Sequence, residues 1–200
     1  DYTAHEKGNY RHHMAKEIHE QPQMIAKTCD YLKSCHQLKA LSDLIAKGQI
    51  KRCQIVACGT SYHAGLMAKT WLEWAKLPVD VEVASEFRYR EPLIAPNTLL
   101  LTISQSGETA DTLAVLKEAK HMGFSHTATL CNVPTSQMVK FADFALITQA
   151  GAEVGVASTK SFTTALAALY HLALEIATSK DILGFDQIAK YRQALDQLPP

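Results

Sequence analysis

Three short segments of the sequence combine glycine with small hydroxyl residues immediately before a predicted helix. They are Cys58–Ser61 (CGTS), Ser104–Thr109 (SQSGET) and Glu153–Lys160 (EVGVASTK). The first backbone N–H groups of a helix have no partner within it and carry a partial positive charge, so they attract anions. Serine and threonine add hydrogen-bond donors, and glycine lets the backbone approach a ligand closely. Such residues are also ordinary N-caps, but three such loops in one chain favour a binding site for a phosphate group.

These loops do not have the spacing of the common nucleotide-binding motifs. Gly59–Gly65 (GTSYHAG) lacks the second glycine of GxGxxG, and no GK[ST] sequence occurs. Acidic and basic residues number 20 each, and the formal net charge of +0 argues against binding nucleic acid through bulk charge. We therefore expect a phosphorylated small molecule, such as a sugar phosphate, rather than a nucleotide.

The elements that would position the loops alternate between strands and helices. Apolar strands separated by helices indicate a parallel sheet covered on both faces. The expected fold is thus α/β, a three-layer doubly wound sandwich with a mostly parallel five-stranded sheet. Ligands of such folds bind beyond the carboxyl ends of the strands, where the three loops lie. Strands are predicted at 54–58, 79–83, 98–103, 126–131 and 144–148. Helices are predicted at 14–33 with an interruption at Pro22, 37–46, after Ser61 as far as about 76, 112–121, shortly after Pro134, 160–177 and 185–198.

Several charged residues near the loops have ordinary structural interpretations. Glu153 is the best carboxylate candidate near a sugar, but a loop residue of this kind also pairs with backbone N–H groups. Glu108 and Asp111 lie in the first turn of a predicted helix, where a carboxylate favours the helix dipole. Lys160 could approach an anion, although a lysine that opens a helix is usually solvated. Arg88, in the segment SEFRYRE, suggests a surface or an interface.

Composition places the chain in a broad class. No apolar run reaches the roughly 18–20 residues that a membrane span needs, and the polar N-terminus lacks a signal-peptide core.

No metal site is expected, because His12, His13 and His19 have no carboxylate or cysteine at ligand spacing. An opening Asp1 suggests a piece of a longer polypeptide. The five cysteines are Cys29, Cys35, Cys53, Cys58 and Cys131. An odd number without paired close spacing indicates reduced thiols and a cytoplasmic protein. Cys58 is more simply interpreted as a core residue than as a nucleophile.

The motifs CGTSYHAG, SEFRYR, SQSGETADT, CNVP and GVASTKSFTT occur in an order and spacing that resemble one known family. They are similar to the first sugar isomerase (SIS) domain of the glutamine–fructose-6-phosphate aminotransferases, also called glucosamine-6-phosphate synthases. The opening KGNYRHHMAKEIHEQP resembles the segment that joins the glutaminase domain of that family to its isomerase half. The resemblance implies a linker and N-terminal helix over 1–36, a SIS domain over 37–184, and a helix over 185–200 leading to a second SIS domain.

The resemblance also implies an activity and its division among domains. In that family the glutaminase releases ammonia, and two SIS domains transfer it to fructose 6-phosphate and isomerise the product to glucosamine 6-phosphate. No metal or organic cofactor is implied, and a homodimer is. The base, the ring-opening acid and the lysine of the family come from outside the stretch that matches this chain. We therefore expect no catalytic residue here and no activity from the chain alone.

Residues that match the family motif divide into two groups by what they would bind. The resemblance implies that Ser104, Gln105, Ser106 and Thr109 bind the phosphate of the substrate. Residues beside the sugar would be Thr60, Ser61, Val156 and Ser158, with Gly59, Glu153 and Lys160 as further possibilities. The alternative left open is a SIS-type sensor that binds a sugar phosphate and regulates a partner, in which case a DNA-binding domain rather than a glutaminase would precede this sequence.

Overall fold

A computed structural model describes residues 6–198 and has a single five-stranded sheet in that range. Every neighbouring pair of strands is parallel, and the strand order is β2-β1-β3-β4-β5. The chain moves outward in one direction from β1 to β2 and in the other from β3 to β5. The order therefore reverses between β1 and β3, and this reversal opens a crevice at their carboxyl ends. The strands are β1 (Arg52–Ala57), β2 (Val79–Val83), β3 (Thr98–Ser104), β4 (His126–Cys131) and β5 (Phe144–Ile147).

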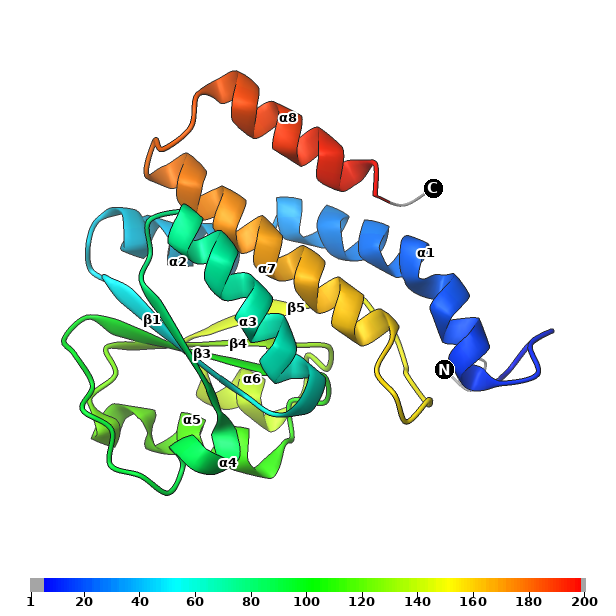
Figure 1. Cartoon of the computed structure of the whole chain (residues 1–200), viewed down its shortest axis with the longest axis horizontal. Helices are drawn as coiled ribbons and strands as arrows, with labels where there is room; N and C mark the ends of the chain where they lie inside the picture. Colours follow the sequence, from blue (N-terminus) through cyan, green and yellow to red (C-terminus); the bar gives the residue numbers. More distant parts are fainter. Residues whose placement is uncertain (1–5, 199–200) are drawn as a thin grey trace.

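Helices cover both faces of this sheet, as expected for a doubly wound sandwich (Figure 1). The apolar residues of α2, α3 and α7 form one core with one face of the strands, and those of α4, α5 and α6 form a second core with the opposite face. Helices α1 and α8 pack on the outer side of α7, so this side has an additional helical layer. The helices are α1 (His13–Lys33), α2 (His36–Ala46), α3 (Gly59–Trp74), α4 (Ala84–Phe87), α5 (Ala110–Met122), α6 (Gln137–Phe141), α7 (Lys160–Ser179) and α8 (Phe185–Asp196).

Two features differ from the sequence prediction. Helix α1 is continuous through Pro22, whereas an interruption was expected there. A proline has no N–H to bond the carbonyl four residues earlier; here that carbonyl, of Ile18, accepts a hydrogen bond from the side-chain amide of Gln21 at 3.1 Å. The short helix α4 was not predicted; it buries Phe87 against the second core. Within residues 6–198 no helix is both long and apolar enough to cross a membrane.

Candidate functional site

A cleft lies where the sheet order reverses, beyond the carboxyl ends of β1, β3 and β4. Its lining combines hydroxyl and amide side chains with apolar ones, and no charged residue is among those that line it in the described part of the chain. The predicted residues Thr60, Ser61, Ser104, Gln105 and Ser158 all line it. The remaining lining residues are Ala64, Ile103, Leu130, Cys131, Asn132, Thr148, Ser161, Phe162 and Ala165.

The loop after β3 is ordered by its own hydroxyl groups. Ser104 Oγ accepts a hydrogen bond from Gly107 N at 3.0 Å and lies 2.9 Å from Thr109 Oγ1. Ser106 Oγ accepts one from Glu108 N at 3.1 Å. Gly107 has a φ of +67°, and a Cβ there would lie 2.2 Å from Ser136 Oγ, so only glycine fits. Ser106 and Thr109 do not line the cleft themselves, although Thr109 contacts Ser104, which does.

The loop after β1 presents the start of α3 to the same cleft. Cys58 is the N-cap residue and makes no capping hydrogen bond with its side chain. The helix begins at Gly59, whose φ is +56° and whose missing Cβ would meet nothing within 4 Å. Within residues 6–198 the first N–H groups of α3 have no protein acceptor and are free for a ligand or water, beside the hydroxyls of Thr60 and Ser61.

Glu153 closes the third loop by capping α7. Its Oε1 accepts hydrogen bonds from Thr159 N at 2.9 Å, from Thr159 Oγ1 at 3.1 Å and from Ser161 N at 3.2 Å. Ser161 Oγ also donates to its Oε2. A carboxylate at a helix N-terminus satisfies unpaired N–H groups and favours the helix dipole. Glu153 thus has the backbone-pairing role considered for it, with Ser158 Oγ 2.7 Å from Ser161 Oγ beside it.

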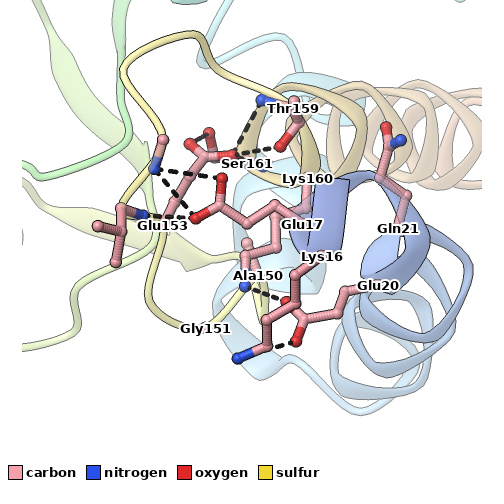
Figure 2. A network of polar contacts seen from close by, with 12 residues as sticks. Lys16, Glu17, Glu20, Gln21, Ala150, Gly151, Glu153, Thr159, Lys160 and Ser161 are labelled. Carbon is pink, nitrogen blue, oxygen red and sulfur yellow. Dashed lines mark hydrogen bonds and ion pairs between the residues drawn. The ribbon is translucent and has the colours of Figure 1, made fainter. Parts of the chain in front are cut away.

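Helix α1 supplies two further carboxylates to this loop (Figure 2). Glu17, only 3% exposed, accepts hydrogen bonds from Val154 N at 2.6 Å and Gly155 N at 3.1 Å. Glu20 accepts one from Lys160 Nζ at 2.6 Å. Burial raises the pKa of Glu20, but the hydrogen bonds and charges of Lys160 and Lys16 together outweigh burial and leave that pKa below its ordinary value.

The prediction that Lys160 is solvated is wrong. Its side chain is only 5% exposed, and it is paired with Glu20 rather than directed into the cleft. A lysine at this depth needs an anion because an unpaired buried charge is costly. The partner lies 140 residues away in sequence, on α1, so nothing in the local pattern indicates it.

Val156 lies on the outside of the same loop. Its side chain is fully exposed, at 107%, and is not among the cleft-lining residues. Ser158, two residues later, lines the cleft. In the described structure the loop therefore presents one of the two predicted residues to the site.

Three comparisons with known proteins agree on what this chain resembles. The sequence model of the SIS domain matches residues 48–175. The chain belongs to the SIS domain family. A protein from Pseudomonas syringae pv. tomato named glutamine–fructose-6-phosphate aminotransferase (isomerizing) is 49% identical over 203 residues, which cover 98% of this chain and 33% of that protein. This chain therefore spans about a third of the length of the curated relatives that it matches.

Solved structures resemble this SIS domain at two levels. The C-terminal domain of glucosamine-fructose-6-phosphate aminotransferase from Francisella tularensis superposes with a TM-score of 0.88 at 45% identity, covering 95% of this chain and 54% of that one. The sugar isomerase domain of an RpiR transcription factor from Sphaerobacter thermophilus superposes with a TM-score of 0.63 at 18% identity, covering 92% and 96%. The second likeness shows the fold alone.

Sequence reasoning missed Asn132 as well as Glu17, and Asn132 organises the cleft of this SIS domain. Its Oδ1 accepts hydrogen bonds from Ala150 N at 2.9 Å and Thr148 Oγ1 at 3.2 Å, and its Nδ2 donates to Gly151 O at 2.7 Å. It thereby ties the end of β4 to the start of the third loop. Its place at a strand end, in the motif CNVP, was a usable signal, because short polar residues there are seldom core.

The other candidates of this SIS domain have structural partners away from the cleft. Glu108 was predicted to lie in the first turn of α5 but precedes that helix; its Oε1 accepts a hydrogen bond from Gln137 N at 2.7 Å at the start of α6. Asp111 pairs with Arg88 at 2.9 Å.

Among residues 6–198 no group of three or more metal-ligating side chains comes together. All five cysteines are free thiols, and burial raises the pKa of Cys29 to about 11.

Proposed function

We propose that this chain is the first of two SIS domains of a glutamine–fructose-6-phosphate aminotransferase and binds the phosphate and hydroxyls of fructose 6-phosphate. The observation that carries the proposal is a cleft at the carboxyl ends of parallel strands that presents hydroxyl and amide groups. The chain that forms it matches proteins with that name over nearly its whole length. Neutral donors and helix N-termini can hold a phosphate without a basic side chain.

We propose the same roles for the predicted residues as the family motif implies. Ser104, Gln105, Ser106 and Thr109 would surround the phosphate, at the loop that orders itself through Gly107. Thr60, Ser61, Val156 and Ser158 would lie along the sugar, and Gly59 would expose the first N–H groups of α3. Glu153 and Lys160 would act indirectly, because their partners in the structure are Thr159, Ser161 and Glu20.

The proton transfers of the reaction would come from elsewhere in the longer protein. Moving a proton between adjacent carbons requires a positioned base, and the cleft-lining residues in the described part of the chain include no histidine, lysine or carboxylate. We therefore expect the isolated chain to form no glucosamine 6-phosphate, whereas the full-length protein forms it from fructose 6-phosphate and glutamine. Glucosamine 6-phosphate made by the isolated chain would refute this division of labour.

We further propose that the full-length protein is a cytoplasmic homodimer. The free thiols of all five cysteines support a reducing compartment. Sedimentation of the full-length protein would measure its oligomeric state.

The alternative is a sensor that binds a sugar phosphate and regulates a partner. The fold does not discriminate between these functions, because a transcription factor domain shares it at 18% identity. The identity of 49% with an aminotransferase over 98% of the chain favours the enzyme. An upstream DNA-binding domain in the full-length sequence would favour the sensor instead.

Calorimetric titration of the full-length protein with fructose 6-phosphate tests the site. Each hydrogen bond to a charged group contributes about 1.5–3 kcal/mol, so Ser104→Ala should weaken binding roughly 10- to 100-fold. Ser106→Ala should weaken it by a smaller factor, because Ser106 does not line the cleft. Ser34→Ala, at an exposed serine that ends α1, is the matched control. Unchanged affinity in Ser104→Ala protein that remains folded would reject the phosphate site.

A further inference from the structure

Glu17 is a buried carboxylate whose partners are backbone N–H groups. Burial of an ionised carboxyl group is costly unless hydrogen bonds compensate for the lost water. Within residues 6–198 Glu17 forms no ion pair, and its carboxylate accepts instead from Val154 N and Gly155 N at 2.6–3.2 Å. These two amides belong to the third loop, four and three residues before Ser158. Figure 2 shows Glu17 reaching the loop from α1, next to Glu153.

Gly155 is the residue that lets this carboxylate approach. A Cβ built on Gly155 would lie 2.5 Å from Glu17 Oε2, closer than a Cβ comes to a non-bonded atom. The φ of Gly155 is not in the left-handed region, unlike that of Gly151, so the backbone itself would tolerate a side chain. Glycine at 155 is therefore required by the contact with Glu17 and not by the turn.

The loop has few other ties to the protein. Glu153 binds Thr159 N, so the residues 154–158 form a short closed segment. Val154 and Val156 are 43% and 107% exposed, and so contribute little packing. Two more contacts with α1 flank the segment: Gln149 N donates to Thr28 Oγ1 at 2.9 Å, and Lys160 Nζ donates to Glu20. Ser158 Oγ itself lies 2.7 Å from Ser161 Oγ on α7, and the segment that leads to Ser158 is held by Glu17 of α1.

We propose that Glu17 is a positioning residue for the sugar-binding loop: its carboxylate fixes Val154 and Gly155 and thereby holds Ser158 where the substrate binds. This proposal rests on the proposed function, because it assumes that Ser158 contacts the sugar. A loop that is already ordered does not have to be ordered at the moment of binding. Loss of the Glu17 contacts therefore lowers substrate affinity without removing any group that touches the substrate.

Steady-state kinetics of the full-length protein test the proposal. Glu17→Ala should raise the KM for fructose 6-phosphate about tenfold with a smaller change in kcat, because the interaction supports ground state and transition state alike. The KM for glutamine should not change. Glu17→Gln keeps one acceptor oxygen for both amides and should recover most of the loss. Glu118→Ala, at an exposed glutamate on α5, is the matched control.

A double-mutant cycle separates positioning from general destabilisation. Gly155→Ala should raise the same KM by displacing the Glu17 carboxylate, and it should have no further effect in the Glu17→Ala protein. Additive effects of the two substitutions would overturn the proposal. So would an unchanged KM in folded Glu17→Ala protein. If Glu17→Ala does not fold, Gly155→Ala carries the test, in the kinetics and in the exchange measurement below.

Amide hydrogen exchange gives a readout that does not need a substrate. Faster exchange of the amides at positions 154 and 155 is expected in the Glu17→Ala and Gly155→Ala proteins, with exchange close to wild type in the Glu17→Gln protein. Unchanged exchange in the first two proteins would overturn the proposal. If the wild-type protein binds no fructose 6-phosphate, the proposed function fails, and exchange still decides whether Glu17 holds the loop.

Discussion

Replacing His171 should reduce the loss of stability in acid. His171 lies in the middle of α7 and is only 6% exposed, where α1, α2 and α8 meet this helix around a polar cavity. Burial lowers the pKa of His171 from an ordinary value of 6.5 to about 4. The positive charges of Arg192 and Lys33 act in the same direction, and the negative charge of Asp196 opposes them. The folded protein therefore holds a neutral imidazole at pH values where the unfolded chain holds a charged one.

The sign and size of the effect follow from proton linkage. Between pH 6.5 and about 4 the unfolded state binds more protons than the folded state at this position, so stability falls as the pH falls through that window. One pKa unit corresponds to about 1.4 kcal/mol, so the difference between 6.5 and about 4 removes about 2 kcal/mol at pH 5 and about 3 kcal/mol at still lower pH. At pH 7 the contribution is close to zero, because both states are mostly neutral.

Urea unfolding at pH 7 and pH 5 measures this contribution, with the fluorescence of Trp71 and Trp74 on α3 as the signal. His171→Leu puts an apolar side chain of similar size at this position of α7 and removes the titration. The decrease in the free energy of unfolding from pH 7 to pH 5 should be about 2 kcal/mol smaller in this variant than in the wild-type protein. His121→Leu, at an exposed position on α5, should leave the decrease unchanged. Equal decreases in wild-type and His171→Leu proteins would refute the linkage.

Two further substitutions test the packing and the charge balance around the cleft. Gly65→Ala should destabilise the chain by about 1–3 kcal/mol, because its Cβ would lie 2.9 Å from Ile55 Cγ2 where α3 crosses the sheet. Gly184→Ala, where a Cβ meets nothing within 4 Å, is the control in the same urea unfolding assay. Glu20→Gln should cost about 2 kcal/mol, because it leaves the buried Lys160 without its carboxylate. Adding Lys160→Met to that variant should restore most of the loss, and failure to restore it would show that the pair does not act as a unit.

The sheet could be predicted because its strands have simple local signals. The strands at Val79–Val83 and His126–Cys131 have the predicted bounds, and β3 begins at the predicted Thr98. Each has β-branched or apolar residues bounded by turn residues, and each is separated from the next by a helical pattern. Parallel pairing then places every strand end at one edge. For that reason Thr60 and Ser104, 44 positions apart in sequence, could be predicted to line one cleft, and they do.

The sequence did not indicate the contacts made by helix α1. An interruption at Pro22 follows from the chemistry of proline alone, yet the side chain of Gln21 compensates for the missing N–H bond. Solvation of Lys160 follows from its place at a helix start, yet Glu20 buries it in an ion pair. The group that bonds Ile18 O is a neighbour in the same helix, three residues away. The partner of Lys160 lies 140 residues away and meets it only through tertiary packing, which propensity and periodicity do not contain.

The same limit explains why the hydroxyl residues of the cleft were easier to predict from the sequence than the roles of the carboxylates. An unpaired N–H group at a helix start can be satisfied equally well by a ligand or by an acidic side chain from another element. At α7 the protein uses Glu153, and at the neighbouring loop amides it uses Glu17. At α3 the N-cap residue Cys58 provides no side-chain acceptor. The anion site is therefore expected at the start of α3 and in the adjoining loop that begins at Ser104. The third loop presents the hydroxyl of Ser158 to the cleft, but amides of that loop already bind the carboxylates of Glu17 and Glu153.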